Sequence, residues 1–320
     1  MLTIISSSDR GKQDLSRVFS SAKWSGDKNA CARSLSLTVL PDADIQLGDH
    51  VVFSNEEKVL LDGFVCEISE STGLGSVKTV EVRDRGLQLN KNEAVYKFTS
   101  ATPAEIVKKV ASDFGFKVGV LPDTGSFRLT RNFVDVALYK IIATAYSKAS
   151  SATGKHYCIR FEGDSLCVRE LKRSASTPLL RPGSNLISAS ATRSITDLVN
   201  RVIITDKNGA ELSRKEDAQS QKDFGLRQAV IKDSDNAAAE AAKMLEDNAS
   251  PAYKINVDGL GDVRFVSGET VAVQDKASGL WGIFAIDSDS HTWQSGIYQV
   301  SLTLTLKNIM ETVDAGSDPK

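Results

Sequence analysis

The sequence has few of the residues on which metal proteins and many enzymes depend, beginning with histidine and cysteine. Its 320 residues include three histidines and four cysteines, which are Cys31, Cys66, Cys158 and Cys167. No two cysteines form a CxxC pair, whereas a structural zinc site needs ligands at short spacing in two clusters. We therefore expect four reduced, partly buried thiols, no metal and no other cofactor.

Two further absences concern charge and long apolar runs. The 39 basic and 41 acidic residues give a formal net charge of -2, so the positive excess of a nucleic-acid-binding protein is missing. No run approaches the roughly 20 apolar residues that span a bilayer. Residues 1–6 lack the basic region and long apolar stretch of a signal peptide. We expect a protein made in a cytosol, with neither a membrane nor a sequence-specific nucleic acid as partner.

The first part of the chain has the alternating pattern of short, half-buried strands. Leu35, Leu37 and Val39 alternate with serine and threonine, and further strand patterns follow at 51–53, 64–68 and 79–83. Such strands, about ten residues apart and separated by Gly, Asp and Asn, predict a small antiparallel barrel or sandwich. We assign residues 1–95 to a first β-barrel domain.

The period then changes to that of helices. Thr102 and Glu105 form a capping box around Pro103, which predicts a helix that ends at Gly115. An apolar stripe predicts a second helix over 135–150, and a hairpin follows over 157–168. Residues 96–177 therefore form an α+β domain.

Strand patterns return in the last part of the chain. A strand at 202–205 leads into an Asn208–Gly209 hairpin turn, and the Ala-rich stretch 234–247 predicts a helix capped by Ser234. The alternation from Tyr298 to Leu306 predicts a long strand inside a sheet, because a long exposed edge would invite aggregation. We assign 178–320 to a second β-barrel domain with a helix-containing insertion around 218–258. The fold class is mainly β with α+β insertions.

A search for catalytic or metal-binding residues favours structural roles. His50 and His156 stand at predicted strand ends, outside any nucleophile or ligand motif. On a strand, Asp287, Asp289 and His291 would share one face and could form part of a metal site. The surrounding residues 287–292 are rich in turn formers, however, so we favour a turn.

Three other features have simple structural readings. The glycine-rich stretches 73–75 and 259–262 lack the Lys-Ser/Thr of a phosphate loop and are interpreted as hairpin turns. The basic cluster Arg169, Lys172 and Arg173 is too short for a nucleic-acid patch and is interpreted as a solvated face. We therefore predict no catalytic, cofactor-binding or metal-binding residue, and a protein that is not an enzyme.

A series of short phrases, in order along nearly the whole chain, resembles one family, the XkdQ/YqbQ proteins of defective Bacillus prophages. The phrases that carry this resemblance are Trp24-Ser25-Gly26-Asp27, Cys31-Ala32-Arg33, Leu47-Gly48-Asp49, Asp84-Arg85-Gly86-Leu87, Tyr96-Lys97-Phe98, Thr102-Pro103-Ala104-Glu105-Ile106, Thr153-Gly154-Lys155-His156-Tyr157, Val199-Asn200-Arg201-Val202, Gly279-Leu280-Trp281-Gly282 and Asp289-Ser290-His291-Thr292-Trp293. The family is similar in fold to the baseplate hubs of contractile tails, including the T4 hub, the late control D proteins and the hub part of type VI spikes.

This resemblance implies a structural hub without catalytic residues. Two barrels per subunit would give a homotrimeric ring of pseudo-sixfold symmetry that joins the tail tube to the central spike. The implied partners are further copies of the chain, the spike protein, a tail tube or tube-initiator protein and other baseplate proteins. The implied setting is a bacterial host cytoplasm, followed by assembly into the tail of a virion, a defective prophage or a tailocin.

One strand face is a candidate surface for such an assembly. Gln299, Ser301, Thr303 and Thr305 alternate with the apolar residues of the last strand and carry no charge. A freely solvated strand face normally carries more Lys and Glu, so we expect these residues to contribute to an interface or a lumen.

Two other functions remain alternatives to the hub. A tail-associated peptidoglycan hydrolase would clear peptidoglycan in a zymogram, although the sequence has no Cys-His or Glu-based lytic signature. A carbohydrate- or receptor-binding tail module would show an exposed aromatic platform and saturable glycan binding. A hub from a flexible tail is a weaker third possibility.

Overall fold

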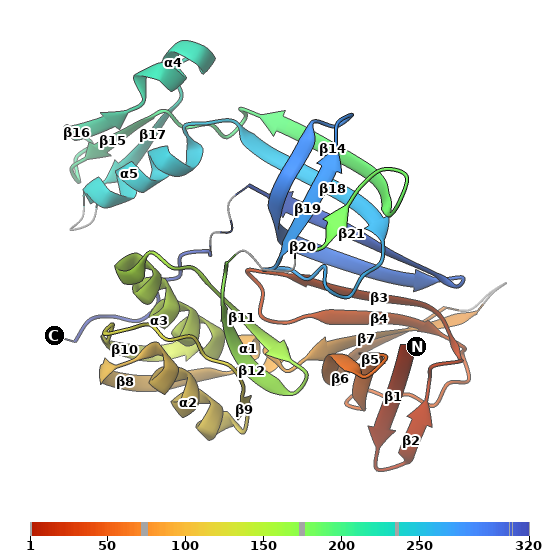
Figure 1. The fold of residues 1–320 in the computed structure, drawn as a ribbon. Coiled ribbons are helices and arrows are strands. Elements are labelled where there is room, and N and C mark those ends of the chain that lie inside the picture. The colour runs from red at the N-terminus through yellow and green to blue at the C-terminus, as the bar shows by residue number, and fades with distance from the viewer. Residues whose placement is uncertain are drawn as a thin grey trace. The chain divides into compact units, whose positions relative to one another are not determined.

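A computed structural model describes residues 2–71, 76–172, 177–233, 237–306, 308 and 310–319. The chain divides into two compact units, the first formed by Met1–Ala189 with Asn256–Lys320 and the second by Ser190–Ile255. Most of the regular structure is β-strand (Figure 1). This confirms the mainly β class that the strand patterns predict. None of the helices in the described ranges is long and apolar enough to cross a membrane.

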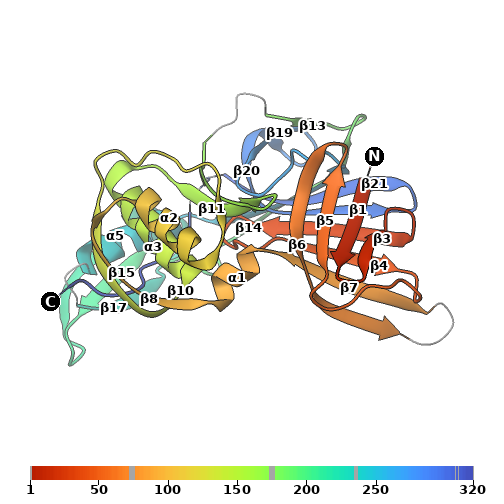
Figure 2. The same ribbon diagram turned by 90° about the horizontal axis from the view of Figure 1, so that it is seen from below.

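The amino-terminal part of the first unit consists of seven strands. They are β1 (Leu2–Ser8), β2 (Gly11–Asp14), β3 (Phe19–Asp27), β4 (Ser34–Val39), β5 (His50–Asn55), β6 (Lys58–Ser71) and β7 (Val77–Asp84). The predicted alternation holds in β4, where Leu35, Leu37 and Val39 are buried and the residues between them are partly exposed. Seen from below, β1, β5 and β6 run steeply across the direction of β3, β4 and β7, so this part of the sheet is strongly bent (Figure 2).

Within the described ranges, strands from the last part of the chain join these in one sheet of thirteen strands. The additional strands are β13 (Leu179–Leu180), β14 (Leu186–Ser194), β18 (Ala252–Leu260), β19 (Thr270–Asp275), β20 (Leu280–Gln294) and β21 (Ile297–Thr305). The order is β14-β18-β21-β20-β3-β4-β7-β6-β5-β1-β2, with β19 pairing with β20 and β13 pairing with β19. The antiparallel β3–β20 pair therefore connects the two β regions. The last strand, β21, lies between β18 and β20, which confirms its predicted place inside a sheet.

Two of the turn predictions were wrong. Residues 287–292 lie within β20, where β3 and β21 pair with the strand on both sides. Backbone ladders on two edges outweigh the turn preference of Asp and Ser. Residues 259–260 end β18, and 261–262 begin the connection to β19. Strand β18 pairs with β14 and β21 and not with β19, so 259–262 is not a hairpin turn. The other glycine-rich stretch, 73–75, lies outside the described residues.

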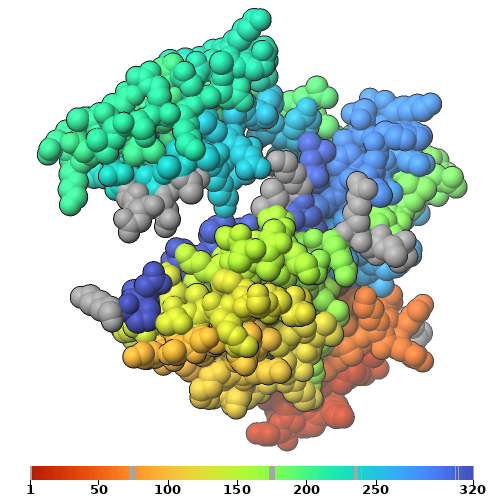
Figure 3. All heavy atoms as spheres, turned by 60° about the vertical axis from the view of Figure 1, so that its left-hand side comes forward, coloured from red at the N-terminus to blue at the C-terminus, as the bar shows by residue number. Residues whose placement is uncertain are grey.

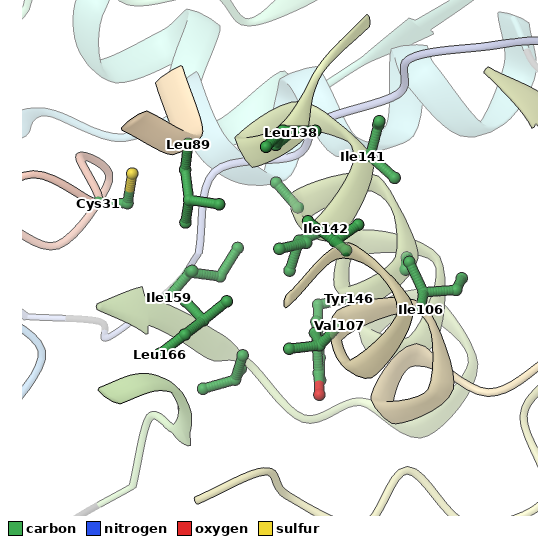
Figure 4. Close-up of a cluster of buried hydrophobic side chains, with 14 of the residues drawn as sticks. Cys31, Leu89, Ile106, Val107, Leu138, Ile141, Ile142, Tyr146, Ile159 and Leu166 are labelled. Atoms are coloured by element: carbon green, nitrogen blue, oxygen red, sulfur yellow. The ribbon is translucent and has the colours of Figure 1, made fainter. Parts of the chain in front are cut away.

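The α+β part packs around a core of its own. Its elements are α1 (Gly86–Lys91), β8 (Glu93–Ala101), α2 (Pro103–Phe114), β9 (Lys117–Val118), β10 (Leu129–Ala137), α3 (Leu138–Thr153), β11 (Tyr157–Glu162) and β12 (Ser165–Glu170). Figure 4 shows Ile106 and Val107 of α2 facing Ile142 and Tyr146 of α3, with Leu166 from β12 nearby. Burial of these apolar side chains is the main stabilising contribution here.

The two predicted helices, α2 and α3, agree with their sequence signals. The capping box of Thr102 and Glu105 is formed, and Gly115 ends α2 in the left-handed conformation. Helix α3 begins at Leu138, three residues later than predicted, because β10 continues to Ala137. The predicted hairpin is β11 paired with β12.

After β21 the chain returns to the α+β part as an extended segment. The backbone N–H groups of Val313 and Ala315 donate to the hydroxyls of Ser147 and Thr144 on α3, each over 2.9 Å. The nearly buried Arg131 donates to the carbonyls of Ala315 and Gly316 in the same segment. In Figure 3 the dark-blue end of the chain lies against the yellow-green α+β part. The carboxyl-terminal segment therefore ties the sheet to the α+β core.

The second unit is a small three-stranded sheet with a helix on one face. Its elements are β15 (Arg201–Thr205), β16 (Glu211–Glu216), α4 (Ala218–Phe224), β17 (Gln228–Lys232) and α5 (Ala237–Asn248). Val202 and Ile204 pack against Ala237 and Ala241 of α5. The predicted 202–205 strand and 234–247 helix are both confirmed, and Gly209, at φ 88°, lies in the turn between β15 and β16. The proposed cap Ser234 lies outside the described residues.

Candidate functional site

The candidate residues of β21 belong to a polar surface that continues across five neighbouring strands. Directly opposed residues in a sheet point to the same face. Ser301 of β21 pairs with Ser290 of β20, which pairs with Ser25 of β3. Ser25 in turn pairs with Ser34 of β4, and Ser34 with Arg83 of β7. One row of side chains therefore runs across both β regions.

A second row lies beside the first and has the same character. Gln299 pairs with Thr292, Thr292 with Lys23, Lys23 with Ser36, and Ser36 with Glu81. We call the surface formed by these rows and their flanking pairs the polar face. It comprises Ser21, Lys23, Ser25, Asp27, Ser34, Ser36, Thr38, Thr79, Glu81, Arg83, Ser288, Ser290, Thr292, Gln294, Gln299, Ser301, Thr303 and Thr305, together with the exposed Ile297, which pairs with Gln294.

Serine and threonine dominate the polar face, and its few charges balance. The charged members are Lys23, Asp27, Glu81 and Arg83, two of each sign. Of the four predicted residues, Gln299 and Ser301 are exposed, whereas Thr303 and Thr305 are partly exposed. The surface offers hydrogen-bonding hydroxyls and amides but no strong field of either sign.

Ser301 also links the polar face to β18. Its hydroxyl donates to Asp258 Oδ1 over 2.6 Å, and Ser188 of β14 donates to the other oxygen of the same carboxylate over 2.6 Å. Both contacts lie within the first unit. They extend the hydrogen-bonded surface to β14, at the far end of the strand order.

The opposite side of β3 and β20 holds a buried polar cluster, which we call the buried junction. It consists of Trp24, Arg33, Asp289, His291 and Tyr298. The Arg33 guanidinium donates to both oxygens of Asp289, with Nη1 to Oδ1 at 3.1 Å, and lies 4.0 Å from the centre of the Trp24 ring. Trp24 pairs directly with His291 across the two strands, and their ring centres are 4.8 Å apart. The buried junction therefore joins the two β regions through side chains as well as backbone.

Hydrogen bonds fix the ring of His291 at both nitrogens. Nε2 lies 2.9 Å from the backbone carbonyl of Phe265, and Nδ1 lies 2.8 Å from the hydroxyl of Tyr298. A carbonyl oxygen only accepts, so Nε2 carries a hydrogen, and the same nitrogen lies 3.3 Å from Asp289 Oδ2. Both nitrogens are thus engaged by the fold.

Charge compensation makes Asp289 an ion-pair partner in the interior. Burial opposes ionisation of Asp289, but Arg33 and His291 outweigh it and hold the pKa of this carboxyl well below its usual range. Asp287, the third residue of the metal hypothesis, pairs instead with Lys28 at 2.8 Å. The structure brings Asp289 and His291 together, and the described residues contain no cluster of three potential metal ligands.

A second buried aspartate, Asp84, accepts hydrogen bonds from two backbone amides. The amides of Arg33 and Gly86 donate to it over 3.1 and 2.9 Å. Burial raises its pKa to about 7 against these hydrogen bonds and the charge of Arg33. A Cβ on Gly86 would lie 2.4 Å from the Cys31 carbonyl oxygen, so only glycine fits there. Residues 31–33 and 84–87, which are distant in the sequence, therefore pack closely against each other.

The remaining candidate residues have structural positions. All four cysteines are free, with Cys31, Cys158 and Cys167 buried and Cys66 exposed. His50 begins β5 and lies 3.0 Å from Asp62, as expected of a strand-end residue. In the basic cluster, Arg169 pairs with Glu162 at 2.6 Å, and Arg173 lies outside the described residues.

The sequence pattern found the β21 part of the polar face but missed the rest. The alternation of β4 was used only to predict a strand. It also indicates that Ser34, Ser36 and Thr38 lie on the outward face of that strand. The contribution of β20 was missed because its residues were interpreted as a turn.

Comparisons with known sequences identify the family to which this chain belongs. Residues 22–305 match the YQBQ-like family model, and the chain belongs to this family. The chain is 23% identical over 313 residues to the phage-like element PBSX protein XkdQ of Bacillus subtilis (strain 168), covering 92% of this chain and 95% of that protein. The resemblance carried by the sequence phrases is thereby confirmed.

Solved structures with the same fold come from tails and secretion systems. The 43 kDa tail protein of prophage MuSo2 from Shewanella oneidensis matches with a TM-score of 0.74 at 15% identity, covering 97% of this chain and 99% of that one. The E. coli c3393 protein matches with a TM-score of 0.58 at 11% identity, covering 95% of this chain and 76% of that one. It is described as a component of the type VI secretion system with structural similarity to the T4 tail proteins gp27 and gp5.

Proposed function

We propose that this protein is a non-enzymatic structural hub in the baseplate of a contractile phage-type tail. In this proposal three copies form a ring of pseudo-sixfold symmetry that joins the tail tube to the central spike. Its further partners are a tube or tube-initiator protein and other baseplate proteins. Assembly follows synthesis in the bacterial host cytoplasm.

Two lines of comparison support a role in a tail. The chain shares a family with a protein of a phage-like element, and its fold extends over nearly the whole length of a prophage tail protein. The same fold occurs in a component of the type VI secretion system described as similar to T4 tail proteins.

The observation that carries the hub proposal is the continuity of the polar face across both β regions. The β3–β20 pair places residues near the two ends of the sequence in single rows, such as Ser301, Ser290 and Ser25. A surface that spans both regions and lacks a dominant charge is suited to line a shared lumen or a subunit interface. Gln299, Ser301, Thr303 and Thr305 lie on this surface in the proposed ring.

The domain assignment is part of the same proposal. Residues 1–95 and 178–320 each supply one barrel-type domain to the ring, with 96–177 as the α+β domain and a helix-containing insertion around 218–258. The strand order within the described residues runs from β14 to β2 without returning to its start. In the ring, neighbouring copies cover the remaining open edges, because closed rings remove edges that would otherwise aggregate.

Light scattering and negative-stain imaging of the purified full chain, with and without its spike protein, test the hub. We expect a threefold particle with a central opening, formed by the chain alone or on addition of the spike. A strict monomer that captures neither a spike nor a tube protein would overturn the proposal. Clearing of peptidoglycan in a zymogram would favour a hydrolase instead.

A further inference from the structure

A cavity of about 680 Å³ lies on the side of β3 that faces away from the polar face. Trp24 and Arg33 line it, and Trp24 points to the opposite side of β3 from Ser25, because successive side chains alternate across a strand. The other walls come from the start of β6, the β11–β12 hairpin and the 263–270 loop. Its volume is in the range of about 300–1,000 Å³ that is typical of ligand pockets.

Ion pairs hold the hairpin wall of this cavity in place. Arg169 and Arg160 both contact Glu162, over 2.6 and 2.9 Å, and Arg160 also reaches Glu269 over 3.0 Å. Glu162 is half-buried, yet the arginines outweigh the effect of burial and lower its pKa to about 2. The carboxylate of Glu162 is therefore ionised and already occupied by two arginines.

The cationic groups nevertheless outnumber the anionic ones. Six of the lining residues are Lys or Arg and three are Glu. Arg33 and Arg264 pair with Asp289 and Asp262, which lie outside the lining, so four cations face three carboxylates. Lys58 and Lys172 are exposed, and neither has an ion-pair partner among the described residues. Two lysine ammonium groups thus remain available to a ligand that enters the cavity.

Two lining residues also carry buried donors that lack an acceptor. Trp24 Nε1 and Arg33 Nε have no hydrogen-bond partner, although both side chains are almost fully buried. A buried donor without a partner costs about 1–3 kcal/mol, so such groups call for an explanation. Neither nitrogen is accessible from the cavity, so the polar groups that a ligand can reach without moving the wall are the two lysines.

We propose that this cavity binds carboxylate groups presented by an acidic segment of a partner protein. Carboxylates carry the negative charge and the acceptor oxygens that match the two free lysines. The apolar parts of Val59, Phe161 and Val266 give the cavity room for the aliphatic portion of a glutamate side chain. This site is separate from the polar face and does not depend on the ring.

Fluorescence anisotropy of a labelled oligoglutamate peptide, with the full chain as receptor, tests the proposal. We expect saturable binding that weakens as salt is added, and no binding of an oligoglutamine peptide of equal length. The double variant Lys58→Gln/Lys172→Gln should bind about tenfold more weakly, since two surface ion pairs together change affinity by roughly that factor. The matched control Lys12→Gln/Lys97→Gln removes two exposed lysines elsewhere and should bind as the wild type does.

Three results would overturn the proposal. These are absence of oligoglutamate binding, equal binding of oligoglutamine, and equal loss in the double variant and its control. A further arm adds succinate as a competitor. Displacement by succinate at concentrations no higher than those of unlabelled oligoglutamate would replace the acidic segment with a free dicarboxylate as ligand. Light scattering on the same samples reports the ring separately, so failure of either proposal is distinguishable from failure of the other.

Discussion

The two faces of the β3–β20 pair are built from alternate residues of the same strands, yet they differ in burial and in polar contacts. One face carries the buried junction, in which Arg33, Asp289 and His291 have defined partners. The other carries the polar face, with small hydroxyl side chains in rows. The same pair of strands can therefore join two regions through buried side chains on one face and leave the other face free for contacts.

The largest expected effect comes from breaking the ion pair of the buried junction. Asp289→Ala leaves the Arg33 guanidinium buried without its carboxylate, which should lower the free energy of unfolding by about 3–5 kcal/mol. The measurement is urea denaturation at pH 7. Ser290→Ala, the adjacent residue on the polar face, is the control and should change stability by no more than about 0.5 kcal/mol. Similar losses in both variants would remove the distinction between the faces.

A smaller effect should follow from adding a single methyl group to the buried side. A Cβ on Gly26 would lie 2.2 Å from Arg33 Nη1 and 2.6 Å from its Cζ, so Gly26→Ala must displace the guanidinium from Asp289 and Trp24. We expect a loss of about 1–3 kcal/mol, as for other overpacked sites. Ser36→Ala on the polar face provides the comparison by thermal denaturation. An unchanged melting temperature for Gly26→Ala would show that the guanidinium has room to move.

The two buried aspartates should respond to pH in opposite directions. The pKa of Asp289 is lowered on folding, so its contribution is complete above the unfolded value of about 3.9 and is lost as the pH falls towards the folded value. The pKa of Asp84 is raised to about 7, so its ionisation costs the folded state stability as the pH rises from about 4 to 7.

Denaturation series from pH 3 to pH 8 compare the two asparagine variants with the wild type. The deficit of Asp289→Asn should shrink as the pH falls below about 4. The stability of Asp84→Asn relative to the wild type should increase as the pH rises towards 8. Parallel curves for both variants would contradict the roles assigned to arginine and to burial.

The smallest effect on stability is expected on the polar face, where assembly should respond instead. Ser290→Lys/Thr303→Lys places two charges on half-exposed positions and should alter unfolding by no more than about 0.5 kcal/mol. Light scattering in the presence of the spike should nevertheless show less ring than in the wild type. Thr99→Lys, on an exposed position of β8, is the control. Normal assembly of the double variant would remove the polar face from the proposed ring.

Local signals allowed much of the fold to be predicted. The capping box at Thr102, the left-handed Gly115 and the alternation in β4 and β21 all depend on neighbours in sequence, and all are confirmed. The failures involve partners that are distant in sequence. Residues 287–292 have turn-forming composition, but pairing with β3, more than 250 positions earlier, makes them a strand.

The sequence by itself determined the mainly β class, the helices of the α+β part and the family, because periodicity, capping and ordered phrases are local properties. Only the tertiary structure decided that β3 and β20 pair, that Arg33 meets Asp289, and that the polar residues of β21 continue into β20, β3, β4 and β7. These contacts depend on strand register across long chain separations. Alternation specifies which face a residue occupies, whereas the pairing of strands specifies its neighbours on that face.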